Sequence, residues 1–79
     1  MRHAITIRRS TEQDRTQIVR LAALDDRPAP HGDSLLGFVD GELRAAVPLG
    51  RGPAVADPFR LTSDVVELLR FRAHQEKAA

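Results

Sequence analysis

The chain has 79 residues, of which 42% are hydrophobic, and its formal net charge is +1 at pH 7. This length accommodates one domain with a single core, and the near-neutral charge gives no general attraction to nucleic acid or anionic lipid. Because the chain has no cysteine, disulfides, thiolate metal sites and cysteine nucleophiles are excluded.

The N-terminal third predicts a strand followed by an amphipathic helix. Apolar and polar residues alternate over residues 3–9, as in a half-buried strand. Ser10 and Thr11 are both candidate N-caps, because Gln13 and Asp14 follow them by three residues, the spacing of a capping box, so we expect the helix to begin at one of them. An apolar stripe formed by Ile18, Leu21 and Ala22 continues the helix to about residue 24. Residues 25–33 have the Pro, Gly and Asp content of a loop.

The middle of the chain predicts a β-hairpin, because Asp40-Gly41 separates two apolar runs and both turn positions of such a hairpin need positive φ. Pairing outward from the turn sets Phe38 opposite Leu43, Leu36 opposite Ala45, and Ser34 opposite Val47. These six residues would form one apolar face. The other face, which includes Leu35, Val39 and Ala46, is mixed.

The C-terminal third predicts a turn at residues 50–53, a short strand within 54–57 and a final helix capped by Thr62 or Ser63. The expected fold is therefore α+β, in the order β-α-β-β-(β)-α, with a mainly antiparallel sheet of three or four strands and two helices. Ten apolar residues are expected in the core: Ile5, Ile7, Ile18, Leu21, Leu36, Phe38, Leu43, Val47, Val65 and Leu69.

The final helix has a wide apolar arc. Leu68 and Phe71 extend the arc to about 220°, whereas a one-sided surface helix needs only about 100°. These two side chains face either other elements of the domain or a partner. We predict a homodimer, with a hetero-complex through the same surface as the alternative. The residues assigned to this interface are Leu68, Phe71, Leu35, Val39 and Ala46.

No pattern in the sequence predicts a catalytic, cofactor-binding or metal-binding residue. His3, His31 and His74 are far apart in the sequence and lack the spacing of a zinc site. Residues 50–54 loosely resemble a phosphate-binding turn, but such a turn must open a helix and here an extended stretch follows. We therefore interpret it as a hairpin turn and expect no cofactor.

Charged residues have structural interpretations as well. Asp25 and Asp26 are adjacent at the expected helix end, which favours helix termination over an acid/base pair. The N-terminal part contains Arg2, Arg8, Arg9, Arg15 and Arg20. No aromatic residue precedes Phe38, which favours a solvated surface over a nucleic-acid interface. The first eight residues lack the apolar stretch of a secretory signal, and no apolar run approaches a membrane span, so we expect a cytoplasmic protein without membrane contact.

Three stretches resemble the N-terminal half of the GNAT N-acetyltransferase fold, namely ITIRRSTEQD with IVRLAALD, then LLGFVDGELRAAVPL, then AVADPF. The resemblance covers roughly residues 3–57 and lies in the order of strand, Thr-x-x-Asp cap and Asp-Gly hairpin. The tail DPFRLTSDVVELLRFRAHQ is similar to short actinobacterial relatives. The family's acetyl-CoA loop, Arg/Gln-x-x-Gly-x-Gly/Ala before a long helix, has no counterpart, and the chain has no tyrosine.

The resemblance thus implies a single GNAT-like partial domain over residues 1–79 and transfers no catalytic or cofactor residue. Three functions remain as hypotheses. The first is a non-catalytic interaction or oligomerisation domain. The second is the acceptor-side half of a split acetyl-CoA-dependent N-acetyltransferase that a partner chain completes. The third is a small regulator associated with nucleic acid, for which binding would depend on salt.

Overall fold

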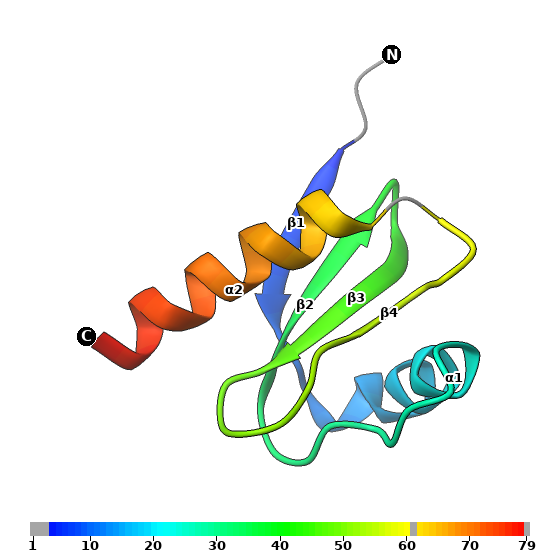
Figure 1. Cartoon of the computed structure of the whole chain (residues 1–79), viewed down its shortest axis with the longest axis horizontal. Helices are drawn as coiled ribbons and strands as arrows, with labels where there is room; N and C mark the ends of the chain where they lie inside the picture. The colour runs from blue at the N-terminus through cyan, green and yellow to red at the C-terminus, as the bar shows by residue number, and fades with distance from the viewer. Residues whose placement is uncertain (1–3, 61, 79) are drawn as a thin grey trace.

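A computed structural model of the chain describes residues 4–60 and 62–78 (Figure 1). Its elements in order are β1 (Ile5–Arg9), a 3-10 turn (Glu12–Asp14), α1 (Arg15–Leu24), β2 (Ser34–Val39), β3 (Glu42–Pro48), β4 (Val55–Ala56) and α2 (Ser63–Ala78). The strands form one sheet in the order β1-β2-β3-β4, and each neighbouring pair is antiparallel. The predicted α+β fold and element order are confirmed. Neither helix, over the part of the chain described, is long and apolar enough to cross a membrane.

Local signals set the start and end of α1. The carboxylate of Asp14 accepts hydrogen bonds from the Thr11 backbone N–H at 2.7 Å and from the Thr11 hydroxyl at 3.0 Å. This reciprocal contact is the predicted capping box, and it leads through the 3-10 turn into α1. At the other end Asp26 adopts a φ of 52°, the left-handed conformation that stops a helix. The interpretation of the Asp25-Asp26 pair as a helix end is confirmed.

The β2–β3 hairpin turns at Asp40 and Gly41, whose φ values of 52° and 84° are those of the predicted turn. The predicted pairing of Phe38 with Leu43 is confirmed, but the register beyond it is wrong. Arg44 occupies an extra position on β3, so Leu36 pairs with Ala46 instead of Ala45, and Ser34 pairs with Pro48 instead of Val47. From Ala45 onward, this bulge reverses the faces of β3 that the simple alternation assigned.

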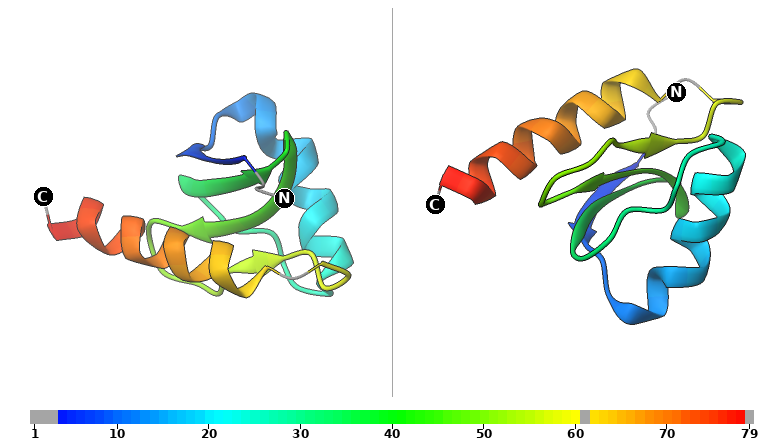
Figure 2. Two further views of the ribbon diagram at one scale, coloured as in Figure 1. Left: turned by 90° about the horizontal axis from the view of Figure 1, so that it is seen from above. Right: turned by 60° about the horizontal axis from the view of Figure 1, so that its bottom comes forward.

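The two helices cover opposite faces of the sheet (Figure 2). On one face α1 packs on a cluster that contains Leu36, Ala46 and Val55. On the other face α2 packs through Val65, Leu69 and Ala73 on a second cluster, which contains Leu35, Ala45 and Val47. Because β2 and β3 contribute to both clusters, these central strands are buried on both sides.

Covering both faces corrects part of the predicted interface. Leu35 is 4% exposed and Ala46 is fully buried, so neither is available to a partner. Val39 is half-buried against the α2 cluster. Leu68 and Phe71 are 39% and 60% exposed, so they are the members of the predicted set that reach the surface.

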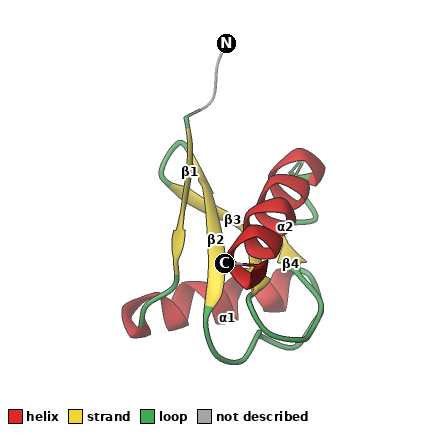
Figure 3. Ribbon diagram, turned by 90° about the vertical axis from the view of Figure 1, so that its left-hand side faces the viewer, coloured by secondary structure: helices red, strands yellow, loops and turns green. Residues whose placement is uncertain are grey.

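The predicted core is correct for most of its members, with a clear exception at the N-terminal strand. Ile5 is 46% exposed, because β1 is an edge strand and α2 contacts β2 and β3 instead. Ile7, Phe38 and Leu43 are half-buried at the margins of the two clusters. Figure 3 shows β1 at the edge of the sheet, with α2 set back from it.

Candidate functional site

The surface between β1 and α2 is the candidate site, and its floor is the α2-facing side of β1. Ile5, Ile7 and Arg9 pair with Val39, Gly37 and Leu35 of β2. Since directly paired residues point to the same side of a sheet, these three residues of β1 lie on the α2 side. Ile7 and Val39 both pack against the α2 cluster. The floor of the site is therefore apolar, except at Arg9.

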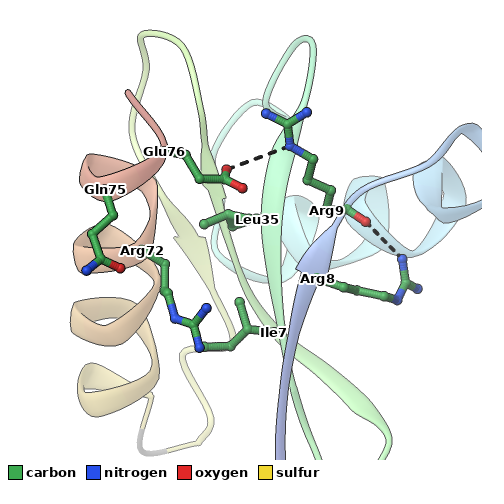
Figure 4. Close-up of a pocket in the computed structure, with 7 residues that line it drawn as sticks. All are labelled: Ile7, Arg8, Arg9, Leu35, Arg72, Gln75 and Glu76. Atoms are coloured by element: carbon green, nitrogen blue, oxygen red, sulfur yellow. Dashed lines mark hydrogen bonds and ion pairs between the residues drawn. The ribbon is translucent and has the colours of Figure 1, made fainter. Parts of the chain in front are cut away.

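One wall of the site is a face of α2. Arg72 and Gln75 line a groove of about 270 Å³ together with Ile7, Arg9 and Leu35 (Figure 4). Leu68 and Phe71 lie four residues before Arg72 and Gln75. Residues four apart stand within about 40° of each other around a helix, so Leu68 extends this wall along the side of α2 that borders β1. Phe71 lies further round the helix, toward solvent, as its 60% exposure shows.

Polar side chains close the far end of the groove. Glu76 from α2 forms an ion pair with Arg9 from β1, with 3.7 Å between Oε2 and Nε (Figure 4). Both side chains are largely exposed, so this pair contributes little to stability and mainly balances the charge of Arg9. The surface thus combines exposed apolar side chains at one end with a balanced charge pair at the other.

The opposite side of β1 has a second ion pair. The Arg8 guanidinium donates to both carboxylate oxygens of Asp14, at 2.7 and 2.8 Å, and stacks 4.8 Å from the centre of the Phe38 ring. These hydrogen bonds hold the pKa of Asp14 well below its usual range; burial opposes the shift, and the N–H of Thr11 adds to it. The same contact raises the pKa of Arg8. Both arginines of β1 therefore have an acidic partner within the chain.

The other groups considered from the sequence do not come together. His31 and His74 are exposed, and His3 lies outside the described residues. No set of three or more His, Asp or Glu residues within the described ranges could hold a metal ion. Residues 49–54 connect β3 to β4, so the interpretation of residues 50–53 as a hairpin turn is confirmed.

The basic N-terminal part is bound largely to the chain's own acceptors. Arg8 and Arg9 contact Asp14 and Glu76, and Arg15 donates to the carbonyl of Pro30 at 2.8 Å. Arg2 lies outside the described residues. This arrangement agrees with the interpretation of these arginines as a structural and solvated surface.

Sequence reasoning missed the polar part of the site. No pattern in the sequence singled out Arg72, Gln75 or Glu76 as site residues, and Arg9 was interpreted only as part of a solvated basic surface. One pattern could have identified the polar residues of α2: Arg72 follows the apolar Leu68 by four residues, and Gln75 follows Phe71 by four residues, so each pair lies about one helical turn apart.

The chain matches no protein-family model, no curated protein sequence and no solved structure. The resemblance to the GNAT fold stays a prediction.

Proposed function

We propose that this chain is a non-catalytic, GNAT-like interaction domain that self-associates through the surface between β1 and α2. The supporting observation is that Ile5 on β1 and Leu68 on the facing flank of α2 are exposed, and that Phe71, further round α2, is exposed next to them. Phe71 is 60% exposed, so most of the hydrophobic stabilisation that burial of its ring would supply is not realised within the described chain.

A protein partner would recover that stabilisation. Full burial of a Leu or Phe side chain is worth about 1.5–3 kcal/mol, before the costs of association are subtracted. The two arginines of β1, Arg8 and Arg9, already have acidic partners within the chain, so a partner does not have to supply charge for them. These features favour an apolar protein surface as the ligand, and a second copy of this chain provides one.

The mass of the purified chain in solution tests this proposal. We expect sedimentation velocity at tens of micromolar to give a dimer for the natural sequence. Phe71→Asp should weaken the association at least about tenfold, because it places a charge in an apolar contact. Val19→Asp is the matched control: Val19 is similarly exposed but lies on α1, at the opposite face of the sheet, so its substitution should leave the mass unchanged.

Two results would contradict the proposal. A monomeric mass for the natural sequence, unchanged by Phe71→Asp, would mean that this surface does not mediate self-association. Binding of acetyl-CoA by the isolated chain, measured by calorimetry, would refute a non-catalytic role. If the chain alone does not bind acetyl-CoA but the chain with a partner does, the split-enzyme hypothesis would be favoured. Salt-dependent binding to DNA or RNA would favour the regulator.

A further inference from the structure

We infer that β1 pairs antiparallel, edge to edge, with β1 of a second copy, around a two-fold axis at Ile7. This inference rests on the proposed function and specifies how the two copies meet. It follows from the direction of the backbone groups of β1, from the protection of the opposite sheet edge, and from the self-complementarity of the strand. The first two observations do not depend on the exposed side chains that support the proposed function, and the third shares only Ile5 with them.

The outward backbone groups of β1 belong to its odd-numbered residues. The carbonyl of Ala4 accepts from Asp40 N–H at 2.9 Å, and the N–H of Ser10 donates to the Ser34 carbonyl at 2.8 Å. The even-numbered positions therefore bond to β2, and the register from Ile5 to Arg9 is uninterrupted. Because backbone direction alternates along an antiparallel strand, the N–H and C=O of Ile5, Ile7 and Arg9 point away from the sheet.

Among the described strands, β1 is the edge that is open to further pairing. The other edge, β4, has two residues, and Pro53 and Pro58 lie beside it. The outward N–H of Ala56 on β4 is already bonded to the Asp25 carboxylate at 3.1 Å. Short strands, prolines and side-chain caps are the usual protections of a sheet edge, and β1 has five residues, no proline and no bulge.

The sequence of β1 is complementary to itself in the antiparallel direction. With the two-fold axis at Ile7, Ile7 lies opposite Ile7 of the second copy. Ile5 then lies opposite the second copy's Arg9, and Thr6 lies opposite its Arg8. All three outward residues of each strand then form backbone pairs. The carbonyl of Arg9 already accepts from the Arg8 guanidinium at 3.1 Å and keeps its second lone pair. A parallel, in-register pair would instead set each arginine beside its copy, and like charges directly opposite are destabilising.

This pairing also places the exposed side chains. A two-fold axis through an antiparallel pair is perpendicular to the sheet, so both α2 helices lie on the same face of a continuous eight-stranded sheet, with four strands from each copy. Leu68 stands on the β1 side of α2 and therefore faces the axis from both copies, and Phe71 borders it on the outer side of the helix. The apolar surface of the proposed function and the open edge thus belong to one interface.

Amide hydrogen exchange of the full chain tests the inference. In the dimer, the amide protons of Ile5, Ile7 and Arg9 become bonded to the partner strand, whereas those of Thr6 and Arg8 are bonded to β2 in either state. We expect the odd-numbered amides to exchange at least about tenfold more slowly at a concentration that gives the dimer than after dilution to the monomer. The even-numbered amides should change much less.

A pair of substitutions at Ile7 provides the second test. Ile7→Pro removes the central outward N–H, at an edge position where proline is tolerated, and Ile7→Ala removes the same side chain but keeps the N–H. We expect Ile7→Pro to weaken dimerisation at least about tenfold more than Ile7→Ala does. If Ile7→Pro does not fold, by circular dichroism, Ile5→Pro and Ile5→Ala replace the pair, because Ile5 is largely exposed.

The outcomes separate this inference from the proposed function. A dimer that is sensitive to Phe71→Asp but leaves the amides of Ile5, Ile7 and Arg9 unprotected would overturn edge pairing and leave the proposed function intact. Equal dimerisation of the Ile7→Pro and Ile7→Ala variants would overturn it as well. A natural chain that is monomeric at every concentration measured would overturn both the edge pairing and the proposed function. Protection confined to the odd-numbered amides would support the inference.

Discussion

At the scale of single residues, Asp14 connects the first strand to the first helix. Its carboxylate accepts from the Thr11 N–H and hydroxyl and from the Arg8 guanidinium, so one buried side chain joins β1 to α1. Removing it leaves the guanidinium and the helix start without their acceptor. The capping part of this arrangement was predictable from a spacing of three residues, whereas the contact with Arg8 depends on which side of β1 faces the helix.

We predict that Asp14→Asn lowers the free energy of unfolding by about 1–2 kcal/mol at pH 7. The loss is no larger because Arg8 is half exposed, and solvent weakens its ion pair with Asp14. The pKa of Asp14 is lowered in the folded chain, so its contribution is present above the unfolded pKa near 4 and decreases as the pH falls below that value. Urea unfolding at pH 7 and pH 3 measures this. The difference in the free energy of unfolding between the natural chain and Asp14→Asn should be smaller at pH 3 than at pH 7. An equal difference at the two pH values would contradict the prediction. Asp33→Asn, at an exposed position, is the control.

At the scale of elements, Gly37 sets how closely α2 approaches the sheet. A Cβ atom at this position would lie 2.6 Å from Cγ1 of Val65 and 3.2 Å from Cδ1 of Leu69. A β-branched valine in a helix has essentially one preferred rotamer, so Val65 cannot easily turn aside. The absence of a side chain at Gly37 therefore allows the close packing of α2 over β2.

We predict that Gly37→Ala lowers the free energy of unfolding by about 1–3 kcal/mol, because it overpacks this contact. Val65→Ala in the same chain should recover part of the loss, since it removes the atom that the new Cβ meets. Gly50→Ala is the matched control, because nothing lies within 4 Å of a Cβ there. Thermal and urea unfolding measure the three variants. A Gly37→Ala chain as stable as the natural sequence would show that α2 can move away from β2 without loss.

The elements also show what sequence reasoning could and could not reach. The Asp40-Gly41 turn was predictable because it depends on the two residues themselves. The bulge at Arg44 was not, because it depends on tertiary contacts: Arg44 bonds to Asp57, which is distant in sequence. The wrong assignment of Ala46 to the interface has the same origin, whereas Leu35 lies on the face that the alternation assigned and is buried because α2 covers that face. The adjacent apolar pairs Leu35-Leu36 and Ala45-Ala46 were a missed signal of strands buried on both faces.

At the scale of the whole molecule, the two core clusters share the strands that separate them. Leu36 and Ala46 face α1, while Leu35 and Ala45 face α2, and all four belong to β2 and β3. A loss of packing on one face therefore loosens strands that the other face needs. We expect the domain to unfold in one cooperative transition, with α1 and α2 losing protection together.

Leu69→Ala tests this coupling, because Leu69 is fully buried in the α2 cluster and is absent from the cluster under α1. Deleting such a side chain costs about 2–5 kcal/mol, and a domain of this size has about 4–12 kcal/mol in total. We predict that the variant loses amide protection in α1 as well as in α2, measured by hydrogen exchange at monomeric concentration. Leu24→Ala, at a half-exposed position of α1, is the control and should change little. Full protection of α1 beside a disordered α2 would instead show that β2, β3 and α1 hold together without the second helix.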